Sequence, residues 1–99
     1  MTNEQLEIFL NRCRNQDRQA QKVIYETYYG FVFSIIKRYC NTQEEIKETV
    51  NDVFFKIFDK ITLYKPGTYF KAWVSKITIR IAIDKYRSQV NKVVTESFE

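Results

Sequence analysis

The chain has 99 residues, enough for one domain with a thin hydrophobic core. Hydrophobic residues make up 44% of the sequence and aromatic residues 16%, a composition that excludes an intrinsically disordered chain. The net charge is +4, histidine is absent and the two cysteines stand apart, which removes the commonest general base and most zinc ligand sets. We therefore expect no catalytic residue, no metal and no cofactor.

Two helices are predicted in the first 40 residues. The first, at about 3–14, begins after Thr2, a favourable N-cap residue, and carries an apolar stripe at helical spacing. A polar break follows, and Asp17 at its end is suited to cap a second helix at about 17–40. Apolar residues recur at steps of three and four along this second helix, which predicts that it packs against a core.

A third helix is predicted at about 43–61, where Thr42 and Glu45 have the spacing of a capping box. The face opposite its apolar stripe is acidic and has Phe55 near its centre. An aromatic ring among charged residues is typical of an interface anchor, although Phe55 packing under a neighbouring loop is the alternative. A partner at this face should present Arg or Lys. The residues that share this face are Glu48, Asn51, Asp52, Phe55 and Asp59.

A loop and a fourth helix follow. Pro66 and Gly67 mark the loop, and Thr68 is expected to cap a helix at about 69–90. Apolar residues lie on two faces of this helix, which predicts a central position in the fold. Residues 91–99 are interpreted as a frayed tail.

The stretch 62–92 holds seven basic residues and one acidic residue. Aromatic residues precede the basic part of the helix, and rings beside cations suit single-stranded nucleic acid, whose bases stack and whose phosphates are charged. The alternative is an ordinary solvated helix face. Periodicity assigns Phe70 to the core, and Trp73 is also more typical of a core position. The candidate DNA-binding residues are Tyr64, Lys65, Tyr69, Lys76, Arg80 and Arg87.

Several short strings, in this order and at these separations, resemble region 2 of bacterial sigma-70 family factors. The spacing is most similar to that of the extracytoplasmic-function class. The resemblance covers about residues 5–90, and its clearest strings are Thr49-Val50-Asn51-Asp52-Val53-Phe54, Phe70-Lys71-Ala72-Trp73-Val74 and Ala82-Ile83-Asp84-Lys85-Tyr86-Arg87.

The resemblance implies an all-α fold, a compact three-helix sigma region 2 bundle with an additional short N-terminal helix. It implies that residues 1–92 form the region 2 domain and that 93–99 are a tail or the start of a linker. The family's second domain, the region 4 helix-turn-helix that reads the −35 element, is not found in the sequence.

The resemblance also implies a transcription factor and not an enzyme. In the family, the helix matching 43–61 docks on the coiled coil of the RNA polymerase β′ clamp, which implies a polymerase-binding role for Glu48, Asn51, Asp52 and Phe55. The loop and helix matching 62–87 recognise the −10 promoter element by capturing a base flipped from the non-template strand. That places Tyr64, Lys65, Tyr69, Lys76 and Arg80 in or near the DNA site.

Two residues depart from the family pattern. Asn51 stands where the family commonly has Gln. Arg80 stands where the family often has Asn, and this second change implies an altered base preference. An anti-sigma factor is a common partner in the family.

One alternative function is a helical protein-interaction module that does not bind DNA. An enzyme built on the carboxylates of the third helix is disfavoured, because they line a surface and the sequence has no histidine and no glycine-rich phosphate loop. No apolar run approaches the roughly 18 residues of a membrane span, and the start of the chain is polar. We therefore expect a cytoplasmic protein without membrane insertion.

Overall fold

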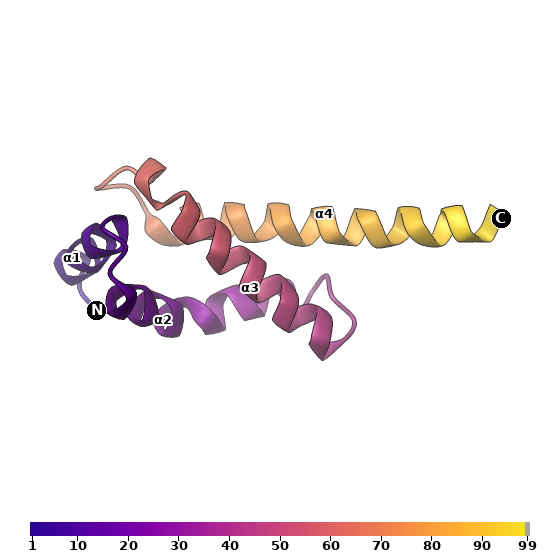
Figure 1. Cartoon of the computed structure of the whole chain (residues 1–99), viewed down its shortest axis with the longest axis horizontal. Coiled ribbons are helices and arrows are strands. Elements are labelled where there is room, and N and C mark those ends of the chain that lie inside the picture. The colour runs from indigo at the N-terminus through magenta and orange to yellow at the C-terminus, as the bar shows by residue number, and fades with distance from the viewer. Residues whose placement is uncertain (99) are drawn as a thin grey trace.

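A computed structural model describes residues 1–98 of the chain, with side chains described to residue 91. All regular elements in this part are helical, which confirms the predicted all-α class (Figure 1). They are α1 (Asn3–Arg14), α2 (Arg18–Ile36), α3 (Gln43–Asp59), the short 3-10 helix η1 (Ile61–Leu63) and α4 (Phe70–Phe98).

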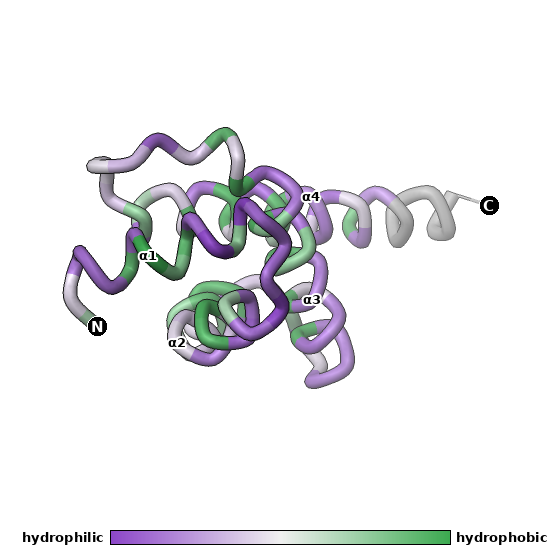
Figure 2. The backbone as a smooth tube through the Cα atoms, turned by 60° about the vertical axis from the view of Figure 1, so that its left-hand side comes forward, coloured by the Kyte–Doolittle hydropathy of each residue, from purple (hydrophilic) through white to green (hydrophobic). Residues whose placement is uncertain are grey.

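The three long helices α2, α3 and α4 pack on one another, and α1 packs against α2 and η1. Apolar and polar residues alternate along the tube in Figure 2, as expected of helices that each bury one face. This arrangement confirms the predicted three-helix bundle with a short helix added at its N-terminus. The fully buried aliphatic side chains at its centre are Leu10, Ile24, Val32, Ile36, Val50, Val53, Ile57 and Val74.

The first two helices begin at the predicted caps. The hydroxyl of Thr2 accepts a hydrogen bond from the Gln5 backbone N–H, and the carboxylate of Asp17 accepts from Gln19 and Ala20. Asp17 also lies 2.8 Å from the guanidinium of Arg12. The hydrogen bond from Arg12, followed by the backbone bond from Ala20, lowers the pKa of Asp17 from its ordinary value. Asp17 therefore stays ionised while it both caps α2 and ties it to α1.

Two predicted helix ends are wrong. α2 ends at Ile36 and not near residue 40. Beyond it, backbone hydrogen bonds join residues three apart, from the Arg38 N–H to the Ile35 carbonyl and from the Tyr39 N–H to the Ile36 carbonyl. α3 begins after Thr42 as predicted, with the hydroxyl accepting from the Glu45 N–H, but it ends at Asp59 and gives way to η1.

The predicted N-cap residue of α4, Thr68, is also wrong. The Thr68 hydroxyl donates to the carbonyl of Lys65 at 2.8 Å and so closes the loop, and the residue that directly precedes α4 is Tyr69. The first helical hydrogen bond there runs from the Trp73 N–H to the Tyr69 carbonyl.

The C-terminal end of α4 differs more from its prediction. The predicted frayed tail is wrong through Phe98, because α4 continues as one helix whose second half runs past the ends of α2 and α3 (Figure 1). α4 packs against both α2 and α3, as predicted for a central helix, but its apolar residues are not all buried: Ile79, Tyr86 and Val90 are exposed. Among the described residues, no helix has the length and apolar character needed to cross a membrane.

Candidate partner and nucleic-acid interfaces

Phe55 stands on the outer face of α3 and is 75% exposed. Its neighbours on this face, Glu48, Asn51 and Asp52, are exposed as well. The predicted outward orientation of the ring is therefore confirmed, and the alternative that it packs under a neighbouring loop is wrong. An exposed ring flanked by carboxylates and an amide has the composition of a contact surface for a basic protein.

Lys85 of α4 connects this acidic face to the next helix. Its ammonium lies 2.9 Å from Asp52 Oδ2 and 3.2 Å from Glu48 Oε1. Partial burial lowers the pKa of Lys85, but the hydrogen bonds that its ammonium donates to the two carboxylates outweigh it and hold the pKa above its ordinary value. Sequence reasoning did not place Lys85 here, since only the packing of α3 against α4 brings the three side chains together. The ammonium partly neutralises the acidic face and orients both carboxylates.

The two tyrosines of the loop have opposite environments. Tyr64 is 3% exposed, whereas Tyr69 is 86% exposed. The Tyr64 ring lies edge-on to Phe70 at a centroid distance of 5.2 Å and 5.4 Å from Trp73, and its hydroxyl donates to the Thr68 carbonyl. The prediction that Tyr64 contacts DNA is therefore wrong: its ring and its hydroxyl are both used to anchor the loop. Tyr69 remains available for stacking.

The predicted cations lie on the exposed surface of the loop and α4. Lys65, Lys76, Arg80 and Arg87 are all exposed. Residues 69, 76, 80 and 87 follow one another at helical spacing, so Tyr69 stands at one end of a basic strip formed by the cations of α4.

Arg80 also lines a groove of about 300 Å³ between the end of α3 and α4. Two exposed lysines, Lys56 of α3 and Lys60 directly after it, lie on its other side, and Trp73 contributes to its lining. Sequence reasoning missed both lysines because they lie in and directly after a helix that is acidic overall. They widen the positive surface beside the strip.

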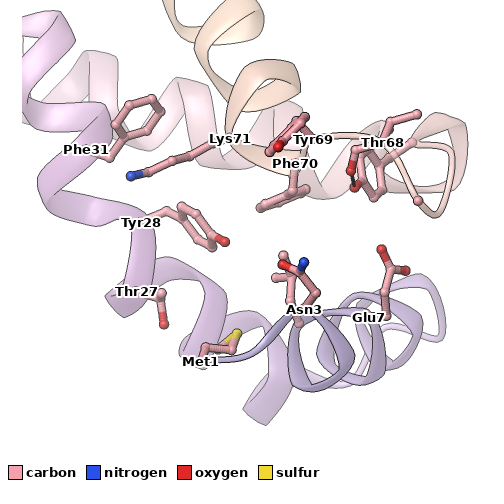
Figure 3. Close-up of a pocket in the computed structure, with 13 residues that line it drawn as sticks. Met1, Asn3, Glu7, Thr27, Tyr28, Phe31, Thr68, Tyr69, Phe70 and Lys71 are labelled. Atoms are coloured by element: carbon pink, nitrogen blue, oxygen red, sulfur yellow. Dashed lines mark hydrogen bonds between the residues drawn. The ribbon is translucent and has the colours of Figure 1, made fainter.

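A larger pocket, of about 910 Å³, lies on the other side of the loop (Figure 3). Tyr28 and Phe31 of α2 face Tyr69 and Lys71 across it, and the Lys71 ammonium lies 5.0 Å from the centroid of the Phe31 ring. Burial, and to a lesser extent Tyr64, raises the pKa of Tyr28, so its phenol stays protonated at neutral pH and can act as a hydrogen-bond donor to a ligand. Aromatic walls with polar groups between them suit a flat heteroaromatic ligand.

The helix α1 completes this pocket. Asn3 and Glu7 project toward it from the side opposite the loop (Figure 3). None of Asn3, Glu7, Tyr28 and Phe31 was predicted as a site residue, because their meeting depends on how α1, α2 and the loop pack. The residues that line the pocket are Met1, Asn3, Leu6, Glu7, Thr27, Tyr28, Phe31, Tyr64, Gly67, Thr68, Tyr69, Phe70 and Lys71.

Comparisons with known proteins identify the family and the fold. The family model described as Sigma-70 region 2 matches residues 24–91, so it begins within α2 and leaves α1 outside. Among solved structures, the chain is similar to an engineered region 2 of sigmaE, determined by NMR in complex with GTAAAA. The TM-score is 0.80 and the identity 18%, over 93% of each chain, which shows a shared fold. A search of curated protein sequences finds no match.

The opposite environments of the two tyrosines predict opposite effects on stability. Tyr64→Ala should lower the free energy of unfolding by about 3 kcal/mol or more, because it removes a buried ring from the core. Tyr69→Ala should change it by less than about 0.5 kcal/mol, because the ring is exposed. Urea denaturation followed by circular dichroism measures both values. Equal effects of the two substitutions would contradict the assignment of Tyr64 as the anchor.

Proposed function

Because this chain belongs to the sigma-70 region 2 family, we propose that it binds RNA polymerase through the outer face of α3 and promoter DNA through the loop and α4. Region 2 is the domain of sigma factors that binds core polymerase and recognises the −10 element. It initiates transcription through binding and carries out no reaction of its own, so we assign no catalytic residue here. We further assign the chain to the extracytoplasmic-function class, residues 1–92 to one region 2 domain, and the site of action to the cytoplasm.

The observation that carries the proposal is the placement of two exposed aromatic rings in surroundings of opposite charge. Phe55 lies among Glu48, Asn51 and Asp52 on α3, and Tyr69 lies at the end of the basic strip on α4. A polymerase surface rich in Arg and Lys matches the first, and a polyanion with unpaired bases matches the second.

On the DNA side, we assign the backbone contacts to the cations and the base contact to the pocket. Lys65, Lys76 and Arg80, with Lys56 across the groove, attract phosphates. A base that leaves the duplex enters the pocket beside Tyr69. Unstacking it costs a few kcal/mol, and stacking on an aromatic ring recovers roughly 1–3 kcal/mol, with phosphate contacts supplying the rest. The engineered sigmaE region 2, which shares this fold, was solved in complex with GTAAAA.

On the polymerase side, the coiled coil of the β′ clamp is the partner that we assign to the acidic face. Phe55 is placed to be desolvated at the centre of the contact, where a large ring contributes most. Glu48, whose side chain is 72% exposed, keeps its carboxylate open to a cation of the partner even while Lys85 binds it. Asn51 offers an amide of shorter reach than the glutamine common in the family.

The alternative is a helical module that binds protein only, and an anti-sigma factor that covers either face is a further partner consistent with the exposed rings. The protein-only alternative requires the strip to be an ordinary solvated surface. In that case the chain does not bind DNA at any salt concentration, with or without the Tyr69 ring.

Tyr69→Ala should weaken the binding of single-stranded DNA about tenfold, the loss expected for one stacked base. Fluorescence anisotropy with a labelled GTAAAA strand, and with a pool of random hexamers, measures the effect on the chain bound to core polymerase. Tyr86→Ala is the matched control, since it removes another exposed tyrosine of α4 that lies far along the helix from the loop. Binding should also fall steeply with added salt. Failure of the wild-type complex to bind either strand, at low salt as well, would contradict the DNA assignment.

Phe55→Ala should weaken binding to core polymerase by about 2 kcal/mol or more, because an anchor ring is lost at the centre of the interface. Biolayer interferometry with immobilised core enzyme gives the affinity, and thermal unfolding should show an unchanged fold. Ile8→Ala removes an exposed apolar side chain of α1 and is the matched control. If both variants bind like the wild type, the docking face lies elsewhere on the molecule.

A further inference from the structure

The loop between α3 and α4 is held by a helix that lies outside the family match. Arg14 in the last turn of α1 reaches Tyr64, 50 residues further along the chain. Its Nη2 donates to the Tyr64 carbonyl at 3.2 Å, and its guanidinium carbon lies 5.9 Å from the centroid of the Tyr64 ring. α1 also packs against η1, which leads into the loop. One residue of α1 thus contacts both the backbone and the ring of the loop anchor.

The anchor in turn fixes the loop. The Tyr64 hydroxyl donates to the Thr68 carbonyl, so the residue before the turn is bonded to the residue after it. Thr68 adds a bond from its hydroxyl to the Lys65 carbonyl, and Gly67 takes a positive φ of 86° that favours glycine. Tyr69 follows directly. The direction in which its exposed ring points therefore depends on where Tyr64 is held.

The neighbouring charges leave Arg14 free for this role. The nearby carboxylate of Asp17 is engaged by Arg12 at 2.8 Å. Within the described part of the chain, the structure pairs Arg14 with the Tyr64 carbonyl and ring and with no carboxylate. A guanidinium paired with a neutral carbonyl keeps its net positive charge beside the loop.

We infer that Arg14 is a positioning residue for promoter capture: it holds Tyr64, and through Tyr64 it presets the loop that presents Tyr69 to a flipped base. This inference rests on the proposed function, since it concerns how the DNA site is formed. A loop that is already in its bound conformation loses less entropy when the strand arrives. Without Arg14, the loop would have to become ordered when the strand binds, and this loss of entropy would reduce the affinity for DNA. The distant Phe55 face would be unaffected.

The test compares Arg14→Gln with Arg18→Gln. Both substitutions remove one positive charge, and Arg18 is exposed at the start of α2, so the pair separates loop positioning from general attraction to DNA. Anisotropy with the labelled GTAAAA strand, on the chain bound to core polymerase, should show about tenfold weaker binding for Arg14→Gln than for Arg18→Gln. Affinity for core polymerase should be the same for both. Arg14→Lys, which keeps a charged donor, should recover part of the loss.

Fluorescence provides a readout that does not depend on DNA. Trp73 is the sole tryptophan, and its ring lies 5.4 Å from that of Tyr64. Arg14→Gln should change its emission and speed hydrogen exchange in the loop without changing the global unfolding curve, whereas Arg18→Gln should change neither. If Arg14→Gln instead unfolds the domain, Arg14 is a stability residue and the inference is overturned.

Two further outcomes separate this inference from the proposed function. Equal DNA affinities of the two variants, with a wild type that binds and a Tyr69→Ala variant that binds more weakly, would overturn the role of Arg14 and leave the proposed function intact. If the wild type binds no strand at all, the proposed function fails. In that case the role in DNA capture fails with it, even where the Trp73 emission shows that Arg14 holds the loop.

Discussion

The burial of Tyr64 is the constraint on which the exposed features of the DNA-binding end depend. A tyrosine that is 3% exposed and packed against Phe70 and Trp73 fixes the chain at the exit from η1. Its hydroxyl closes the loop on Thr68, and only then does the chain enter α4. The loop therefore buries the ring of Tyr64 in the core and leaves the ring of Tyr69 exposed to solvent beside the pocket. Arg14 extends this constraint to α1.

The same packing separates the charges. α3 turns its apolar stripe inward and directs Phe55 and its acids outward, while α4 directs its basic strip away from the bundle. Lys85 of α4 points toward α3, where it binds Glu48 and Asp52. A modest net charge of +4 therefore conceals two surfaces of opposite character on adjacent helices. In the function that we propose, this charge separation lets one small bundle bind polymerase and DNA at the same time.

The features that sequence predicted are those set by local rules. The caps at Thr2 and Asp17 depend on side chains bonding to backbone groups two or three residues away, and the outward position of Phe55 follows from helical periodicity. Tyr64 and Tyr69 lie in a loop without periodicity, so nothing local distinguishes the buried ring from the exposed one. The pocket could not be predicted either, since it joins residues of α1, α2 and the loop that are distant in sequence and meet only through tertiary packing.

DNA and polymerase are assigned here to different faces of the bundle. Amide chemical shifts of the isotopically labelled chain, recorded during titration with single-stranded GTAAAA, distinguish these faces. The shifts should concentrate in the loop from Lys65 to Lys71 and along the strip containing Lys76 and Arg80, while the amides around Phe55 stay unchanged. Shifts centred on the Phe55 face, with the loop unaffected, would show that DNA binds at the face assigned to polymerase.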